Sequence, residues 1–216
     1  MPQKWFSHFY AIGCLSNACM LSAVYVASRD AAGEDNSASL VLLVAFQLHL
    51  VRRLVETVCM MRYPKEATMH VMAYAFGMSY YVVVPFTLYL ASRTAACTPA
   101  LYAGMVVFCV GSLIQWHSHY LLSILGSKNS NKYVIPQGGL FALVSCPHYF
   151  GEVVIYLGLG IACGIDTDSD QLLKWYPFVW VAVNLTLAAR MTHKWYLGRF
   201  PSYNRLGRRA LVPFVL

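Results

Sequence analysis

The sequence has 216 residues, of which 58% are hydrophobic and 12% are charged, and its formal net charge is +7. Soluble globular domains contain about 45–50% apolar and about 25% charged residues, so this composition excludes a disordered chain, a coiled coil and an ordinary water-soluble enzyme. The seven cysteines are scattered without a Cys-x-x-Cys pair, which argues against a disulfide scaffold and for free thiols. The composition indicates a protein that crosses a membrane several times.

Apolar stretches of the length needed to cross a bilayer, about 20 residues each, recur along the chain. We predict an all-α, polytopic transmembrane helix bundle with about six spans, forming a single integral membrane domain over residues 1–216. We expect the last span to run on beyond the membrane. The predicted spans are Phe6–Ala27, Ala38–Met61, Met69–Leu90, Ala100–Leu125, Leu140–Gly164 and Trp175–Arg190.

The basic residues are distributed unevenly between the two sides that six spans create. Thirteen of the 16 Lys and Arg residues lie on or toward the side of both termini, and only Arg29, Arg93 and Lys174 lie on the other. The positive-inside rule then makes the termini cytoplasmic. The net charge therefore reflects topology and does not predict nucleic-acid binding. A basic cytoplasmic surface would nevertheless attract a phosphorylated cofactor.

The second predicted span carries four ionisable residues: His49, Arg52, Arg53 and Glu56. Such groups are costly inside a membrane and normally face a cavity or a partner. Spacings of three and four place His49, one of the two arginines and Glu56 on one helical face. Two interpretations stay open, a polar substrate pocket and an interfacial Arg–Glu pair with a snorkelling arginine.

The fourth span carries Gln115, His117 and His119. Residues i and i+2 point apart on a helix, and no further histidine cluster accompanies them, which argues against a di-iron centre. We therefore expect no metal. Histidines that hydrogen bond to neighbouring helices are the structural alternative.

The fifth span brings an imidazole, phenols and a carboxylate within two helical turns, at His148, Tyr149, Glu152 and Tyr156. A buried carboxylate is very costly unless it is paired or protonated. Glu152 is therefore a candidate functional residue, and a structural pair with a histidine or an arginine is the alternative.

Three motifs stand out in the C-terminal part of the sequence. They are residues 135–141 (Ile-Pro-Gln-Gly-Gly-Leu-Phe), residues 144–152 (Val-Ser-Cys-Pro-His-Tyr-Phe-Gly-Glu), and an ending that combines residues 193–196 (His-Lys-Trp-Tyr) with residues 209–214 (Arg-Ala-Leu-Val-Pro-Phe). Together these motifs resemble the steroid 5α-reductase family. Within this family, residues 4–10, the pattern of residues 49–56, Met69-His70 and Tyr80-Tyr81 look most like the polyprenol reductase branch. The resemblance makes residues 126–216 the family's C-terminal reductase region.

The resemblance implies an NADPH-dependent enzyme of the endoplasmic reticulum membrane. The polyprenol branch saturates the α-isoprene unit of its lipid substrate on the way to dolichol, which supports protein N-glycosylation, whereas the steroid branch reduces a conjugated enone. Matching positions imply cofactor-site roles for Gln115, His119, Tyr133, His148, Glu152, His193 and Tyr196.

The sequence differs from the family pattern in three places, and each difference leads to an expectation. Gly126 stands where an arginine is usual, so Lys128 or Lys132 is expected to meet the cofactor phosphates, and Ala142 stands where the family often has an acid. Relatives also have a further N-terminal hydrophobic segment, so we expect this sequence to lack a first span.

Hydride transfer to a C=C bond needs an electron sink, which a conjugated aldehyde has and an allylic alcohol lacks. Polyprenal is therefore favoured over polyprenol as the species reduced. We expect a donor among His49, Glu56 and Tyr81, supported by Arg53, to polarise the carbonyl. The nicotinamide is expected between the fourth, fifth and sixth spans, and the isoprenoid tail along apolar spans.

Three other functions stay open. The run of residues 137–140 looks more like the steroid branch, which keeps a steroid enone as a substrate. The Pro147-x-Tyr149 element followed by Glu152 also resembles isoprenylcysteine-type methyltransferases, although Ser145-Cys146 replaces the expected Arg-His. A transporter or scaffold would use the same ionisable groups without catalysis.

Overall fold

The computed structural model describes residues 5–30, 36–61, 69–93, 98–128, 133–164 and 171–215. Lys132 and the first residue of the motif at residues 4–10 lie outside these ranges, as does the side chain of Lys128. The expectation that a lysine near residue 130 meets the cofactor phosphates therefore stays a prediction.

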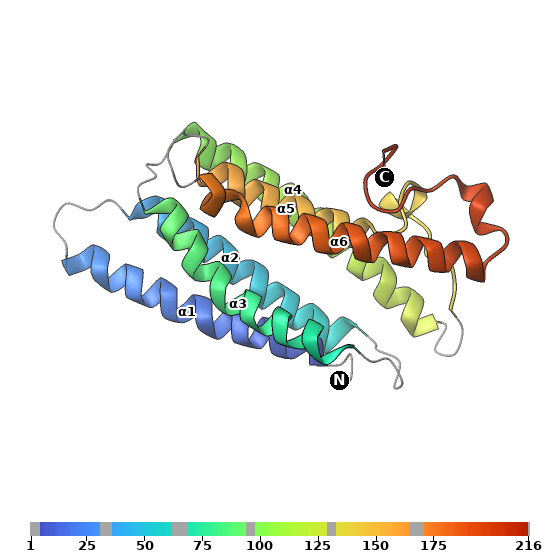
Figure 1. Ribbon diagram of the computed structural model, residues 1–216, viewed down its shortest axis with the longest axis horizontal. Coiled ribbons are helices and arrows are strands. Elements are labelled where there is room, and N and C mark those ends of the chain that lie inside the picture. Colours follow the sequence, from blue (N-terminus) through green and yellow to red (C-terminus); the bar gives the residue numbers. More distant parts are fainter. Residues whose placement is uncertain are drawn as a thin grey trace. The chain divides into compact units, whose positions relative to one another are not determined.

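The chain is helical, as predicted, and within the described ranges it forms no strand, only one isolated bridge between Val144 and Arg209. Among the residues that the structure describes, five helical segments are long and apolar enough to cross a membrane, and they identify a multi-pass membrane protein. The elements are α1 (Phe6–Asp30), α2 (Ser37–Val55), the π-helical turn η2 (Glu56–Met60), α3 (Val71–Ser92), α4 (Pro99–Lys128), the 3₁₀ turn η3 (Gly139–Ala142), α5 (Pro147–Ala162), α6 (Gln171–Arg199) and the 3₁₀ turn η4 (Tyr203–Leu206) (Figure 1).

The fifth helix differs most from its predicted span, because α5 begins at Pro147 and not at Leu140. Proline favours the first turn of a helix, where its missing N–H costs no hydrogen bond. With 16 residues, α5 extends about 24 Å, less than the roughly 30 Å of a bilayer core. In contrast, α6 continues to Arg199, beyond the predicted end at Arg190, as expected for a span that runs on.

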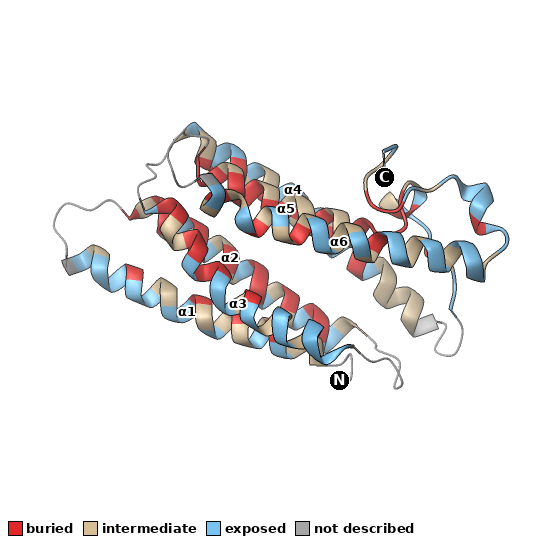
Figure 2. Ribbon diagram, in the orientation of Figure 1, coloured by how far each residue is buried: buried red, intermediate tan, exposed pale blue. Residues whose placement is uncertain are grey.

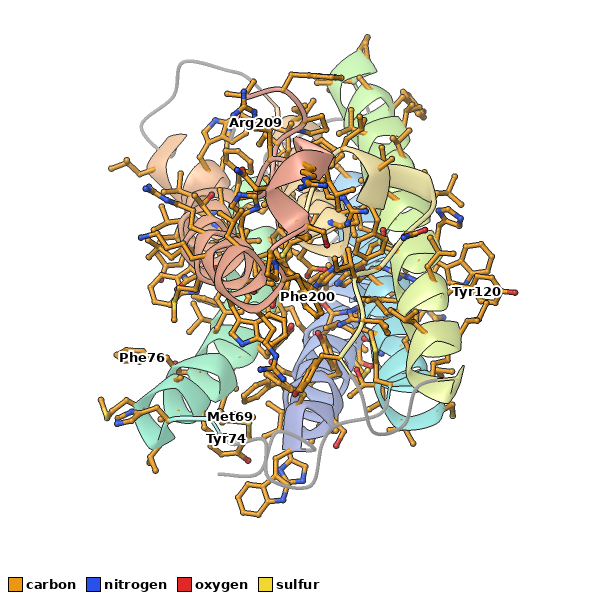
Figure 3. All side chains as sticks on the ribbon, turned by 90° about the vertical axis from the view of Figure 1, so that its right-hand side faces the viewer. Met69, Tyr74, Phe76, Tyr120, Phe200 and Arg209 are labelled. Carbon is orange, nitrogen blue, oxygen red and sulfur yellow. The ribbon has the colours of Figure 1, made fainter. Side chains whose placement is uncertain are left out.

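The chain divides into two compact units, residues 1–104 with 160–177, and residues 105–159 with 178–216. In the first unit α1, α2 and α3 pack against one another, and α2 is half buried (Figure 2). The Phe76 side chain of α3 projects outward and is exposed (Figure 3). Exposed apolar side chains of this kind suit contact with lipid.

Polar side chains join the helices of the first unit. The buried Asn17 amide on α1 donates to the Leu43 carbonyl at 2.9 Å and to the Gln47 side-chain oxygen at 2.8 Å, both on α2. On α3, Ser92 donates to Ser39 of α2 at 2.9 Å. Without a hydrophobic driving force between spans, such bonds help to fix their register.

In the second unit, α4 and α5 approach each other closely at two glycines. A Cβ at Gly151 would lie 2.7 Å from the backbone nitrogen of Gln115, and one at Gly111 would lie 2.7 Å from that of Ile155. Small residues of this kind allow helix backbones to come into contact inside membranes. The crossing places the polar residues of α4 beside those of α5.

The C-terminal segment is bound to the start of α5 by backbone hydrogen bonds. The Arg209 N–H donates to the Leu143 carbonyl at 2.9 Å, and the Arg209 carbonyl accepts from the Ser145 N–H at 2.8 Å. Beside these bonds, a small buried core surrounds Cys146. It also contains Ala189, Ala210 and Leu211. The motifs at residues 144–152 and 209–214 therefore form one structural element, although more than 50 residues separate them along the chain.

Candidate active site

The ionisable residues of α2 form a connected group around Glu56, which we call the α2 cluster: His49, Arg52, Arg53 and Glu56. Arg52 and Arg53 each donate to a different carboxylate oxygen of Glu56, both at 2.6 Å, and Arg52 also contacts His49 Nδ1 at 3.2 Å. His49, Arg53 and Glu56 are buried. Both arginines reach the carboxylate, where the helical spacing alone predicted one of them.

The ion pairs within the α2 cluster compensate for burial of the Glu56 carboxylate. Glu56 is also the first residue of the π-helical turn, in which its carbonyl accepts from the Met61 N–H at 2.9 Å. π-Helical turns are rare in proteins, and many of those that do occur lie at functional sites. The contacts of the α2 cluster are therefore those expected both for a structural Arg–Glu pair and for a polar substrate pocket.

Tyr10 of α1 connects the α2 cluster to Tyr81 of α3. Its hydroxyl accepts a hydrogen bond from Arg53 Nη2 at 2.8 Å, and its ring lies edge-on to Tyr81 with centroids 5.5 Å apart. The four predicted catalytic residues, His49, Arg53, Glu56 and Tyr81, thus belong to one chain of contacts. Sequence reasoning gave Tyr10 no role, and its only signal was its place in the family-like motif at residues 4–10.

The second unit brings together four of the predicted cofactor-site residues at the crossing of α4 and α5. The Gln115 amide donates a hydrogen bond to the Glu152 carboxylate, and the rings of His119 and His148 lie 5.6 Å apart. Gln115 and His119 are buried, whereas Glu152 and His148 are half-buried. Each pair joins one residue of α4 to one of α5. Gln115 and His119 are four residues apart on α4, as His148 and Glu152 are on α5, so each helix presents its two residues on one face. The glycine contacts bring these two faces together.

Two more predicted residues, His193 and Tyr196, lie near the start of α5, around the buried Ser145. The Ser145 hydroxyl is hydrogen bonded to His193 Nδ1 at 2.7 Å and to the Tyr203 hydroxyl at 2.6 Å. Tyr196 stacks on Tyr203 with centroids 4.9 Å apart. Sequence reasoning gave Ser145 and Tyr203 no role in the site, although both are among the residues that resemble the family.

The predicted residue Tyr133 is exposed and lies edge-on to Trp195 at 5.2 Å between ring centroids, and Trp195 in turn lies edge-on to Tyr196 at 5.1 Å. Arg208 donates to the Pro136 carbonyl at 2.8 Å, and its guanidinium carbon lies 5.5 Å from the Tyr203 ring centroid. The segment before η3 is therefore tied to the C-terminal segment by Arg208.

Positive charge is concentrated in the same part of the chain. Residues 178–216 of the second unit contain six Lys and Arg residues and no Asp or Glu. Among them Arg190, Lys194, Arg205 and Arg209 are exposed. Cations without nearby acids attract phosphate groups.

This set of groups fits a nicotinamide dinucleotide phosphate. A carboxamide needs both an acceptor and a donor, which the Glu152 carboxylate and the Gln115 amide supply. Flat rings at Tyr196 and Tyr203 suit stacking, and Arg208 and Arg209 suit phosphates.

Comparison with known proteins places the chain in a family. Residues 62–216 match the family described as 3-oxo-5-alpha-steroid 4-dehydrogenase. Polyprenal reductase 1 of Oryza sativa subsp. indica is 32% identical over all of this chain and 79% of its own length, and polyprenal reductase 1 of Arabidopsis thaliana is 31% identical, with 81% of its length covered. Polyprenal reductase of Caenorhabditis elegans is 30% identical over the whole chain and 80% of its own length.

These matches confirm the resemblance that the C-terminal motifs carry, and they extend it over the whole sequence. Reduction of a carbon–carbon double bond is the chemistry that the family and these relatives share. The chain belongs to the steroid 5α-reductase family and is therefore a reductase.

Proposed function

We propose that this protein uses NADPH to reduce the α-isoprene C=C bond of polyprenal, a step toward dolichol and therefore toward protein N-glycosylation. The observation that carries the proposal is the likeness over the whole chain to three polyprenal reductases at 30–32% identity. The same chemistry, reduction of a double bond conjugated to a carbonyl, underlies the steroid description of the family.

The aldehyde makes the reaction possible. Bound NADPH would supply a hydride. Addition of a hydride at the β-carbon moves the C=C electron pair onto the carbonyl oxygen as an enolate, and a proton then adds to the α-carbon. Hydrogen-bond donors aimed at that oxygen stabilise the developing charge. Polyprenol, an allylic alcohol, offers no such electron sink.

We assign activation of the carbonyl to the first unit. An ionised carboxylate only accepts hydrogen bonds, and both Glu56 oxygens accept from arginines. Glu56 therefore serves to orient Arg53, and the donor to the carbonyl oxygen is His49 or Tyr81. Apolar faces of the spans accommodate the isoprenoid tail.

We assign cofactor binding to the second unit. Gln115 and Glu152 bind the carboxamide, with His119 and His148 beside them. His193, Tyr196 and Tyr133 lie nearer the cationic C-terminal segment, which binds the phosphates. The support is the donor set described above and the family positions of these residues.

We also propose that the protein resides in the endoplasmic reticulum membrane with a cytoplasmic C-terminus. The excess of Lys and Arg on the side of the termini supports this orientation. A C-terminal epitope that antibody reaches after the plasma membrane alone is permeabilised would support it, whereas an epitope reached only after internal membranes are opened would contradict it.

The reaction is tested with the purified full chain in detergent by the loss of NADPH absorbance. Polyprenal, polyprenol and a steroid enone are supplied separately. The proposal predicts oxidation with polyprenal and none with polyprenol. A Tyr81→Phe variant is compared with Tyr102→Phe, whose tyrosine is exposed on α4, and a lower rate in Tyr81→Phe alone would assign the donor role to Tyr81 and not to His49.

Steroid enone reduction is the second candidate function, favoured by the description of the matching family. Oxidation of NADPH with the steroid alone would establish it and refute the polyprenal proposal. Family membership favours either reduction over the methyltransferase and transporter functions.

A further inference from the structure

Helix α1 contacts the α2 cluster through the side chain of Tyr10. The Tyr10 hydroxyl accepts from Arg53 Nη2 at 2.8 Å, and the guanidinium carbon of Arg53 lies 4.8 Å from the Tyr10 ring centroid. One tyrosine therefore meets the guanidinium through both its oxygen and its ring, and these contacts favour a single orientation of that group. Arg53 is buried, so water competes little with either contact.

The same helix also fixes the ring of Tyr81. Tyr10 lies edge-on to Tyr81, and Phe9 lies nearly parallel to it, with centroids 6.2 Å apart. One turn along α1, a Cβ at Gly13 would lie 2.9 Å from Tyr81 Cδ1 and 3.0 Å from Leu50 Cδ2. Glycine at position 13 therefore leaves the space that the Tyr81 ring occupies.

We propose that Tyr10 and Gly13 are positioning residues for the reduction. Tyr10 acts through Arg53, and Gly13 acts through the ring of Tyr81. The inference rests on the proposed function, because it treats Arg53 and Tyr81 as part of the reaction centre. Neither Tyr10 nor Gly13 needs to touch the substrate.

The Tyr10→Phe variant tests the first half, since it keeps the ring contacts and removes only the hydroxyl. A charge-assisted hydrogen bond lost from the reaction centre lowers kcat by about tenfold, while the KM for NADPH stays within about twofold. Tyr25→Phe is the matched control, because Tyr25 lies on the same helix and is exposed. An unchanged kcat in Tyr10→Phe would overturn the role of Tyr10.

A double-mutant cycle with Arg53→Lys separates positioning from a general loss of stability. If Tyr10 acts through the Arg53 guanidinium, the effect of Tyr10→Phe on kcat shrinks to less than about twofold in the Arg53→Lys background. A merely structural role would leave the full effect in both backgrounds, and that result would contradict the inference.

Gly13→Ala tests the second half. The added methyl displaces the Tyr81 ring, so kcat falls in the parent background and changes little when Tyr81 is already replaced by leucine. Gly198→Ala is the control, because nothing lies within 4 Å of a Cβ at that position. An equal loss with and without Tyr81 would refute the role of Gly13.

Different results would refute the proposed function and the positioning roles of Tyr10 and Gly13. A parent protein that oxidises NADPH with neither polyprenal nor a steroid enone refutes the proposed function. In that case the midpoint of thermal unfolding is measured for the same single and double variants in place of kcat. Strict additivity of Tyr10→Phe with Arg53→Lys would overturn the coupling itself, and non-additivity would support it.

Discussion

Gln115 on α4 donates a hydrogen bond to the carboxylate of Glu152 on α5, next to the glycine at which the two helices meet. A Cβ at Gly151 would lie 2.7 Å from the Gln115 nitrogen and 2.9 Å from the Gly111 carbonyl oxygen. The close backbone contact therefore sets the distance at which the polar pair forms. Packing and the candidate cofactor site depend on the same three-residue contact.

Gly151→Ala is expected to destabilise the protein by about 1–3 kcal/mol, because the methyl group meets backbone atoms that cannot rotate away. Thermal unfolding in detergent measures the change. Gly198→Ala is the control, since a Cβ there meets nothing within 4 Å. Equal unfolding midpoints for the two variants would show that the helices do not meet at Gly151.

Glu152→Gln keeps the shape of the side chain and removes its charge. We expect the KM for NADPH to rise by about tenfold, because an acceptor for the carboxamide is lost, while the KM for polyprenal stays nearly constant. Steady-state kinetics with each substrate varied in turn gives both values. A change confined to the KM for polyprenal would move Glu152 from the cofactor site to the substrate site.

Ser145→Ala leaves the buried Tyr203 hydroxyl without the partner that it has at 2.6 Å. The expected cost is about 1–3 kcal/mol of unfolding free energy, the typical penalty for an unsatisfied buried polar group. Ser202→Ala is the control, because Ser202 is exposed. Protease sensitivity of the C-terminal segment is expected to increase in the first variant alone.

Gly126→Arg introduces the residue that the family resemblance leads us to expect at this position. Among the described residues, a Cβ at Gly126 meets nothing within 4 Å, so a side chain can start there without a clash. If the position faces the cofactor phosphates, the KM for NADPH falls by about tenfold, as expected for a new charge-assisted hydrogen bond. Gly198→Arg adds the same charge elsewhere, and an equal fall in both variants would indicate only a general electrostatic effect.

The spans could be predicted from sequence because hydropathy over about 20 residues follows directly from the bilayer thickness. The start of α5 could not, since residues 140–146 are as apolar as a span. Only a short 3₁₀ turn forms there, and the backbone of Leu143, Ser145 and Cys146 bonds to Arg209 and Ala210 instead of continuing into α5. That competition involves residues more than 60 positions apart, which a local pattern does not contain.

Residues on one helix were easier to predict than contacts between helices. The 3.6-residue repeat predicts that His49, one of the two arginines and Glu56 share a face, and the ion pairs of both arginines confirm the Arg–Glu contact. The roles of Tyr10 and Ser145 depend on tertiary neighbours and had no periodic signal. The π-helical turn after Val55 likewise has no signature in residue type.

The central claim is that a hydride from NADPH reaches the β-carbon of polyprenal on this protein. The most direct test incubates the full chain with NADPH deuterated at C4, with each face of the ring labelled in turn, and locates the label by mass spectrometry. We predict one deuterium on the β-carbon of the α-isoprene unit, with one of the two labelled forms. Oxidation of NADPH without label in the lipid, or a saturated product only from a steroid enone, would contradict the account.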